Sequence, residues 1–305
     1  MNKFTKLSLF ALLLATTIFS SCKKEYDTAQ TIDDAAIKAY ISKNNLTQMQ
    51  PDSAKTGFYF QVTNPTDGSF FLNTDSVLYD VTVKSMTNGT TYLQSPSNGN
   101  LGTYVGYLNG FFQSSLSTST TYNIPALRTA VLKLKPGGTA RILLPSYLGF
   151  GRNGAGPIPS NENLDFIVKT YPYRKQWVFD DAKIQSYLTA KALTATKDPS
   201  RIYYIVNTIG TGDNVNGVES TVNIKYTGRT LDGTSFDSNS DGYSSTLTGL
   251  IQGWQIMIPK FKVGTKFRMF IPSDLAYGRS GNGSGSIPPN TVLDFDIEIV
   301  SVTNP

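Results

Sequence analysis

The 305-residue sequence contains no histidine and a single cysteine, Cys22. Without histidine, the chain cannot build a Ser-His-Asp or Cys-His catalytic arrangement, nor the usual histidine-based metal sites. A single cysteine cannot form an intramolecular disulfide, so the fold does not depend on one for stability. We expect no metal ion and no cofactor, and any chemistry must proceed without imidazole.

Charged residues are also scarce, at 16% of the chain, and 27 basic and 22 acidic side chains give a formal net charge of +5. Arginine-rich runs and basic stripes are absent, so nucleic acid is not an expected partner. Long segments with helical apolar periodicity are few, whereas 26 glycines, 17 tyrosines and 17 phenylalanines are present. This composition favours a β-rich chain with aromatic cores, and the length allows two domains of ordinary size.

The start of the chain has the pattern of a targeting segment. Lys3 and Lys6 precede an apolar run from Leu7 to Phe19, which ends shortly before Cys22. The apolar run is too short to span a membrane comfortably. The pattern resembles a bacterial lipoprotein signal, in which cleavage before the cysteine is followed by lipidation of that cysteine. A plain secretory signal with an incidental cysteine is the alternative.

This resemblance implies a signal peptide over residues 1–21, lipidation at Cys22 and a lipid-anchored linker over residues 22–30. Removing residues 1–21 lowers the formal net charge from +5 to +3, because two lysines and no acidic residue are lost. Acyl chains would tether the protein by burying methylene groups in the bilayer. We therefore expect a protein of the cell envelope of a Gram-negative bacterium, anchored in the outer membrane and facing the periplasm or the cell surface.

The sequence is organised as two similar halves. DDAAIKAYISKN at 33–44 is repeated as DDAKIQSYLTAK at 180–191, and both have the apolar spacing of a short amphipathic helix. A β-rich body follows each predicted helix, beginning with GFYFQV at 57–62 and RIYYIV at 201–206. The longest gap-free match aligns KPGGTARILLPSYLGFGRNG (135–154) with KVGTKFRMFIPSDLAYGRSG (262–281).

Alternating patterns in the second half predict strands. The apolar positions of three such strands are Val222, Ile224 and Tyr226; Phe267, Met269 and Ile271; and Leu293, Phe295, Ile297 and Ile299. In the last of these, acidic residues fill the alternate positions, which predicts a half-buried strand with its acids on one face. LIQGWQIMI at 250–258 predicts a short helix that ends before Pro259 and Gly264. The expected body is an antiparallel sheet wrapped on one short helix.

Four motifs of the second half occur in the order of one family, although the segment between Phe236 and Trp254 is short. They are VNIKYTGRTLDGTSFDS (222–238), LIQGW (250–254), VGTKFRMFIPSDLAYG (263–278) and SIPPNTVLDFDIEI (286–299). Together they resemble the FKBP-type peptidyl-prolyl isomerases, the immunophilins that bind macrolides such as rapamycin, and four ordered motifs are far more specific than one.

The resemblance implies an α+β fold with two FKBP-like domains. Each would be an antiparallel β-sheet of five or six strands curled around a short α-helix, with an extra N-terminal helix in each repeat. The implied boundaries are a degenerate domain over residues 31–173 and an isomerase domain over residues 177–305.

The resemblance also assigns site residues, position by position. It places Trp254 at the floor of an apolar pocket, polar contacts to the substrate at Asp237 and Tyr277, and a backbone N–H that holds a substrate carbonyl at Ile287. These four residues are the implied catalytic set. The implied substrate-binding residues are Tyr226, Phe236, Tyr243, Leu250, Ile251 and Phe295, with Tyr243 at a position where the family usually has phenylalanine.

Each assigned residue also has a purely structural interpretation. Aromatic residues at these spacings could pack in a core, and Asp237 could cap a turn. The glycines between residues 281 and 285 could form a loose surface loop, and Pro288 with Pro289 a rigid turn before the last strand.

The first half lacks several of the assigned groups. The aligned pairs, with the first half named first, are Tyr92 and Phe236, Leu93 and Asp237, Ile124 and Ile251, Leu127 and Trp254, Phe150 and Tyr277, Ile158 and Ile287, and Phe166 and Phe295. An indole, a carboxylate and a phenol are therefore replaced by apolar side chains. A partner of Tyr226 cannot be placed without introducing a gap.

Two functions fit these observations. The intact site of the second half predicts a tethered peptidyl-prolyl isomerase that acts on proline-containing unfolded or exported polypeptides, and it allows macrolide ligands. The altered first half favours the alternative, a non-enzymatic peptide-binding chaperone or a subunit of an envelope assembly. The first half could serve for spacing or stability, or as a docking module, for which the aromatic-rich segment 102–113 is a candidate.

Overall fold

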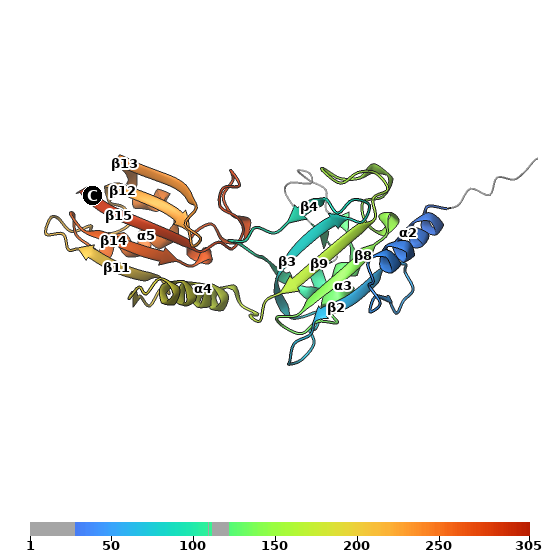
Figure 1. Ribbon diagram of the computed structural model, residues 1–305. Helices are drawn as coiled ribbons and strands as arrows, with labels where there is room; N and C mark the ends of the chain where they lie inside the picture. Colours follow the sequence, from blue (N-terminus) through green and yellow to red (C-terminus); the bar gives the residue numbers. More distant parts are fainter. Residues whose placement is uncertain (1–27, 109, 112–121) are drawn as a thin grey trace, which may run out of the picture.

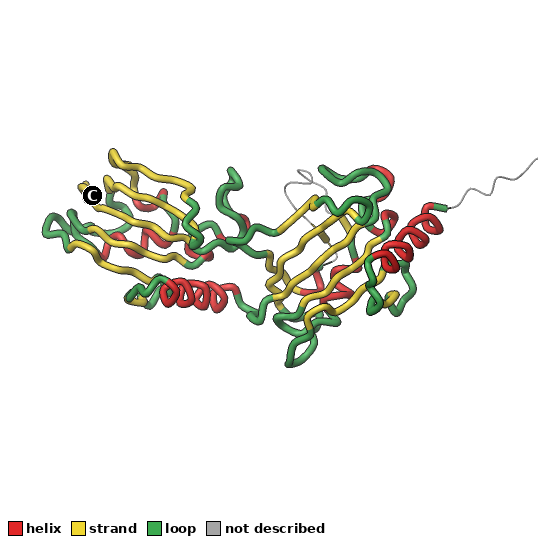
Figure 2. The backbone as a smooth tube through the Cα atoms, viewed as in Figure 1, coloured by secondary structure: helices red, strands yellow, loops and turns green. Residues whose placement is uncertain are grey.

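A computed structural model describes residues 28–108, 110–111 and 122–305 of the chain. They form two domains, each with an antiparallel sheet and short helices (Figures 1 and 2). The predicted signal peptide, Cys22 and most of the predicted linker lie outside the described residues. In the described part, no helix is long and apolar enough to cross a membrane.

The first domain begins with helix α2 (Ala29–Lys43), which starts earlier than predicted and takes in the last residues of the expected linker. A second helix, α3 (Pro125–Val131), packs against the sheet. The strands of the sheet are β1 (Gln50–Pro51), β2 (Tyr59–Asn64), β3 (Ser76–Ser85), β4 (Thr91–Gln94), β5 (Leu101–Tyr104), β8 (Thr139–Leu144) and β9 (Leu164–Thr170). A separate two-stranded ribbon contains β6 (Gly110–Phe111) and β7 (Tyr122–Asn123), and the 3-10 turns are η1 (Val105–Tyr107), η2 (Ser146–Leu148) and η3 (Gly151–Asn153).

The second domain repeats this plan. Its helices are α4 (Gln176–Ala190) and α5 (Gln252–Met257), and its strands are β10 (Thr196–Lys197), β11 (Tyr203–Thr208), β12 (Thr221–Thr230), β13 (Ser235–Thr246), β14 (Lys266–Ile271) and β15 (Leu293–Thr303). The 3-10 turns are η4 (Leu247–Gly249), η5 (Ile258–Lys260), η6 (Ser273–Leu275) and η7 (Gly278–Ser280).

The two sheets have the same topology. The strand order is β1-β2-β8-β9-β3-β4 in the first and β10-β11-β14-β15-β12-β13 in the second. In the first sheet, β5 also pairs with β3, along a different part of that strand than β4. The single long edge strand β13 therefore corresponds to two short strands, β4 and β5, separated by a loop over residues 95–100. The predicted α+β fold with two similar domains is confirmed.

Apolar side chains on one face of the second sheet form a core against helix α5. Phe267 and Met269 of β14 and Phe295 of β15 are buried there with Trp254 and Met257 of α5. Helix α5 begins two residues after the start of the predicted segment, with Ile251 as its N-cap. The 3-10 turn η5 follows it directly and contains Pro259, where the sequence predicted the helix to have ended.

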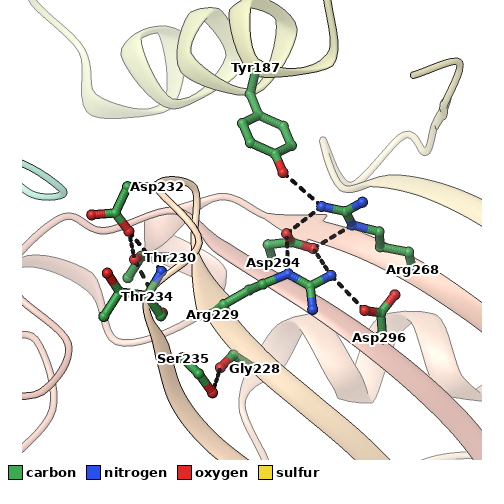
Figure 3. Close-up of polar contacts among 10 residues, drawn as sticks. All are labelled: Tyr187, Gly228, Arg229, Thr230, Asp232, Thr234, Ser235, Arg268, Asp294 and Asp296. Carbon is green, nitrogen blue, oxygen red and sulfur yellow. Dashed lines mark hydrogen bonds and ion pairs between the residues drawn. The ribbon is translucent and has the colours of Figure 1, made fainter. Parts of the chain in front are cut away.

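Alternation predicts that the acidic face of β15 is exposed to solvent, but part of this face is buried. Asp294 on β15 is fully buried, because helix α4 covers this end of the sheet. The carboxylate accepts hydrogen bonds from Arg229 and Arg268, and Arg268 also donates to the hydroxyl of Tyr187 on α4 (Figure 3). These contacts raise the pKa of Arg268, so the buried carboxylate is compensated by a fixed positive charge.

Helix α4 packs on the second domain, a point that the sequence leaves open. Ile184 and Leu188 are buried against Tyr203 and Phe270 of the sheet. The fully buried Asp180 accepts hydrogen bonds from the backbone N–H of Ser273 at 2.9 Å and from its hydroxyl at 2.6 Å. In the first domain, Asp33 of α2 accepts a hydrogen bond of 2.7 Å from the hydroxyl of Ser146, whereas the Ser146 N–H donates to the side chain of Asn163.

Candidate functional site

Aromatic rings cluster between helix α5 and the inner face of the second sheet. The Trp254 ring lies 5.2 Å from Tyr226 and 5.0 Å from Phe295, with interplanar angles of 75° and 80°. Phe236 meets Phe295 edge-on at 5.6 Å, and Tyr243 meets Tyr226 edge-on at 6.3 Å. Edge-to-face packing of this kind is favourable beyond the area that it buries. The structure thus brings five of the sequence-assigned residues into one contact group.

Burial within the cluster changes from one side to the other. Trp254 and Phe295 are buried, whereas Tyr243 and Tyr277 are 42% and 40% exposed. Leu250 and Ile251, just before α5, are partly buried and pack against the same core. The cluster therefore presents a graded surface, with an indole floor and tyrosine side chains that reach solvent.

The indole N–H of Trp254 is buried and has no hydrogen-bond partner in the part of the chain that the structure describes. A buried donor without an acceptor costs about 1–3 kcal/mol and is rare in folded proteins. The second domain tolerates this cost at the floor of the aromatic cluster.

A tyrosine–carboxylate pair lies at the edge of the cluster. The hydroxyl of Tyr226 donates a hydrogen bond of 2.7 Å to the exposed carboxylate of Asp237. Burial raises the pKa of Tyr226 most strongly, and the hydrogen bond to Asp237 raises it further. Burial and the charge of Asp237 likewise raise the pKa of Tyr277. The sequence assigned Tyr226 only as an apolar wall, but its hydroxyl also fixes the carboxylate.

The backbone of β12 approaches two rings of the cluster closely. A Cβ atom at Gly228 of β12 would lie 2.5 Å from the Phe295 ring and 2.7 Å from the Phe236 ring. Since such distances are far inside van der Waals contact, the position admits no side chain while both rings stay in place. Gly228 was not among the residues assigned from the sequence.

Ile287 lies beside the cluster, buried in the same core. Its backbone N–H donates to the side-chain oxygen of Asn282 at 2.9 Å, and its carbonyl accepts from the Asn282 backbone N–H at 3.0 Å. The donor that the resemblance assigns to a substrate carbonyl is thus occupied by a side chain of the glycine-rich loop. Sequence reasoning missed Asn282, whose signal is an amide side chain five residues before Ile287.

The corresponding region of the first domain is ordinary core. Strand register supplies the missing partner of Tyr226: Val81 pairs with Val168 as Tyr226 pairs with Ile297. Val81 and Leu93 therefore replace the tyrosine–carboxylate pair. The apolar residues of these positions are all buried in one cluster, which includes Val81, Leu93, Ile124, Leu127, Phe150, Ile158 and Phe166.

Two details show how fully this region is closed. Phe150 is 6% exposed, whereas Tyr277 at the matching position is 40% exposed. The N–H of Ile158 donates to the backbone carbonyl of Ala155 at 2.9 Å in a tight bridge, instead of to a side chain. In the first domain, these residues therefore fill the core.

Among the residues that the structure describes, no group of three or more histidine, cysteine, aspartate or glutamate side chains could hold a metal ion. What the second domain offers is an aromatic surface, one carboxylate, tyrosine hydroxyls and backbone donors. Such a set can bind and orient a neutral peptide without forming a covalent bond to it.

Comparison with known proteins gives a consistent result. The family model described as FKBP-type peptidyl-prolyl cis-trans isomerase matches residues 73–170 and 214–300. The chain is 39% identical over 136 residues to FKBP-type peptidyl-prolyl cis-trans isomerase FkpA of Aeromonas hydrophila, covering 43% of this chain and 50% of that protein.

Two further relatives extend the comparison. Outer membrane protein MIP of Legionella longbeachae is 38% identical over 107 residues, covering 34% of this chain and 45% of that protein. FK506-binding protein 1 of Saccharomyces cerevisiae is 43% identical over 86 residues, covering 27% of this chain and 75% of that protein. The chain spans about half the length of the two bacterial relatives.

Proposed function

Since this chain belongs to the FKBP-type peptidyl-prolyl cis-trans isomerase family, we propose that its second domain catalyses rotation about Xaa-Pro bonds in unfolded or exported polypeptides. The observation that carries the proposal is the tyrosine–carboxylate pair of Tyr226 and Asp237 above the indole of Trp254. The first domain has lost all three groups.

The reaction requires no nucleophile. Rotation about a prolyl amide faces a barrier of about 18–20 kcal/mol, because the C–N bond has partial double-bond character. Uncatalysed exchange therefore takes tens of seconds or longer. Resonance places negative charge on the carbonyl oxygen, and water stabilises that charge. An apolar aromatic surface removes this hydration and so favours the twisted amide, in which charge separation is reduced.

Each assigned residue has a role in this scheme. Trp254 and the surrounding rings bind the prolyl ring by burying it, and Asp237 and Tyr277 orient the peptide through hydrogen bonds. The N–H of Ile287 holds a carbonyl of the bound peptide after Asn282 has moved aside. Each neutral hydrogen bond contributes about 0.5–1.5 kcal/mol, so desolvation and shape supply more of the rate enhancement than any one donor. The substrate-binding walls are Tyr226, Phe236, Tyr243, Leu250, Ile251 and Phe295.

The first domain, over residues 31–173, is non-catalytic in this proposal. Its support is the replacement of the tyrosine–carboxylate pair by Val81 and Leu93 and the burial of Leu127 in place of the indole. The isomerase domain extends over residues 177–305.

Anchoring at the cell envelope is proposed together with the activity. The support is the lipoprotein-like pattern before Cys22 and the relative named as an outer membrane protein. Cleavage after residue 21 and lipidation of Cys22 would place the chain on the outer membrane of a Gram-negative bacterium. Macrolides would compete with proline-containing polypeptides for the aromatic site.

A matched pair of substitutions in the two domains tests where the activity lies. Phe236→Ala removes an aromatic wall of the second domain, and Tyr92→Ala removes the aromatic residue at the corresponding position of the first. With the chain from residue 23 onward and a prolyl tetrapeptide, we expect kcat/KM to fall at least about tenfold, equivalent to about 1.4 kcal/mol, for Phe236→Ala only. Equal losses in both variants, or no acceleration by the parent chain, would contradict the proposal.

The binding alternative makes a different prediction for the same variants. Tyr104 and Tyr107 of the first domain are more than half exposed, which is the observation that favours a peptide-binding role. A chaperone predicts that Phe236→Ala still prevents aggregation of an unfolded protein as well as the parent does. Isomerase and aggregation assays on the same variants therefore distinguish the two functions.

A further inference from the structure

The two domains meet where the loop between β4 and β5 contacts the turn that follows Ile287. The backbone N–H of Asn100 donates to the carbonyl of Pro289 at 3.1 Å, and the side-chain amide of Asn290 donates to the carbonyl of Asn100 at 2.9 Å. Figure 1 shows this loop extending from β4 toward the second domain. The interruption of the edge strand in the first domain thus produces a contact with the loop that carries Ile287.

Helix α4 reinforces this junction. The side-chain amide of Asn100 donates to Gln176 at 2.9 Å, and the ammonium of Lys183 donates to the carbonyl of Asn290 at 3.2 Å. Both asparagines are buried, and both have hydrogen-bond partners. Buried polar groups that are satisfied in this way define a specific arrangement.

Steric fit at the junction is equally close. A Cβ atom at Gly99 would lie 2.3 Å from the carbonyl oxygen of Pro289, a distance that real side chains do not show. The junction therefore requires glycine at this position for packing reasons.

Next to these contacts lies a cavity of about 850 Å³ with walls from both domains. One wall comes from β5, with Gly102 and Thr103, and from Tyr107; the other comes from residues 279–290. A second cavity of about 620 Å³ adjoins it, since Gly102, Thr103, Tyr107, Arg279 and Asn290 line both. The first volume lies within the range of roughly 300–1,000 Å³ that is usual for ligand sites.

The chemistry of the walls suits an extended polypeptide. Strand β5 has one partner strand, β3, among the described residues, so its other edge offers backbone donors and acceptors. Tyr107, 76% exposed, presents an aromatic ring beside this edge. Arg279 is exposed and has no ion-pair partner in the part of the chain that the structure describes, and the lining of both cavities includes no acidic side chain.

The cavity also adjoins the aromatic site of the second domain. Ile287 belongs to the core that contains Trp254 and Phe295, and it lines the junction cavity as well. Asn282, which occupies the Ile287 N–H, lines the same cavity. A chain held at Ile287 can therefore continue directly between the two domains.

We propose that the junction cavity binds the extended polypeptide that flanks the prolyl bond, so that the first domain supplies part of the substrate site for long substrates. The proposal rests on the isomerase function proposed for the second domain. In it, a short peptide fills only the aromatic site, whereas a long unfolded chain also pairs with the edge of β5 and contacts Tyr107 and Arg279.

The test compares two substrates on the same chain, from residue 23 onward. One is a prolyl tetrapeptide, and the other is a long unfolded protein whose refolding is limited by a prolyl bond. For Tyr107→Ala and Arg279→Gln, we expect the ratio of kcat/KM for the long substrate to that for the tetrapeptide to fall about fivefold, through KM of the long substrate. The controls are Phe70→Ala, an exposed aromatic outside the cavity, and Arg152→Gln, the residue that corresponds to Arg279 in the first domain.

Gly99→Ala provides an independent arm, because it separates the cavity walls without removing a wall side chain. It should lower the same ratio, and the controls Phe70→Ala and Arg152→Gln apply to this variant as well. Ratios equal to that of the parent in Tyr107→Ala, Arg279→Gln and Gly99→Ala would overturn the proposal. A parent chain without activity on either substrate would instead overturn the isomerase function.

Discussion

At the backbone of Ile287, the side chain of Asn282 occupies the N–H that our proposal gives to a substrate carbonyl. Asn282 reaches this N–H because the loop of the second domain is two residues longer than that of the first, where the backbone of Ala155 makes the equivalent bond to Ile158. A side chain can rotate away more easily than a backbone bridge can open. In the longer loop, the Ile287 N–H thus becomes available once the Asn282 side chain rotates away.

Removing the Asn282 side chain should strengthen substrate binding. In Asn282→Ala the substrate carbonyl no longer competes for the Ile287 N–H, so we expect KM for a tetrapeptide to fall about threefold, as for one hydrogen bond of about 0.7 kcal/mol. Asn282→Asp keeps an acceptor and makes it charged, so it should raise KM. Identical KM values in the parent and both variants would exclude competition at this donor.

The ionisable groups of the site predict a flat pH dependence. Burial and the hydrogen bond to Asp237 raise the pKa of Tyr226 above its usual value of 10, and burial raises that of Tyr277. Because the folded-state pKa values exceed the unfolded ones, their stabilising effect is fully present below pH 10 and is lost as pH rises through the folded values. The chain has no histidine to titrate near neutrality.

We therefore expect kcat/KM for a tetrapeptide to vary less than about twofold between about pH 6 and pH 9. A pH–rate profile corrected for the uncatalysed reaction measures this directly. A sigmoidal change centred near pH 7 would show that a group outside the tyrosine–carboxylate pair controls the rate.

At the scale of elements, each domain fixes its leading helix through one buried carboxylate. Asp180 on α4 binds the hydroxyl and N–H of Ser273, and Asp33 on α2 binds the hydroxyl of Ser146 at 2.7 Å. Tyr187 and Tyr40 make matching contacts to an arginine of the adjacent sheet. The repeat therefore extends to individual hydrogen bonds between helix and sheet.

Asp180→Ala should destabilise the second domain. The substitution leaves the buried N–H and hydroxyl of Ser273 without their acceptor, which we expect to cost about 2–4 kcal/mol. Hydrogen exchange of the β14 amides measures the effect within this domain. The control Asp274→Ala, which removes an exposed pair with Arg201, should cost less than about 1 kcal/mol. Similar losses in the two variants would show that burial of Asp180 is not decisive.

Periodicity and motif order predicted the elements well, because helices and strands repeat on a short local scale. The aromatic cluster followed from the same motifs. Burial of Asp294 was not predictable, since it depends on α4 covering the sheet. Pairing of Val81 at the position of Tyr226 required the strand register. The contact of Asn282 with Ile287 has no periodic signal, because it is one side chain reaching across a loop.

At the scale of the whole molecule, the two domains differ in the aromatic cluster but are joined by a direct contact. The first domain carries buried apolar side chains where the second carries its site, yet its loop over residues 95–100 contacts the turn beside Ile287. Loss of the site residues and interruption of the edge strand occur in the same domain. In our proposal, a domain without a site of its own thus contributes to the surroundings of the site in its neighbour.

The hydrogen bond between Asp33 and Ser146 joins residues 113 positions apart, and that between Asp180 and Ser273 spans 93 positions. Each bond closes one continuous stretch of chain, and the two stretches do not overlap. The first domain can therefore complete its fold without the second, since domains generally fold as units. A first domain that folds earlier presents Asn100 in place when the loop that carries Pro289 folds against it.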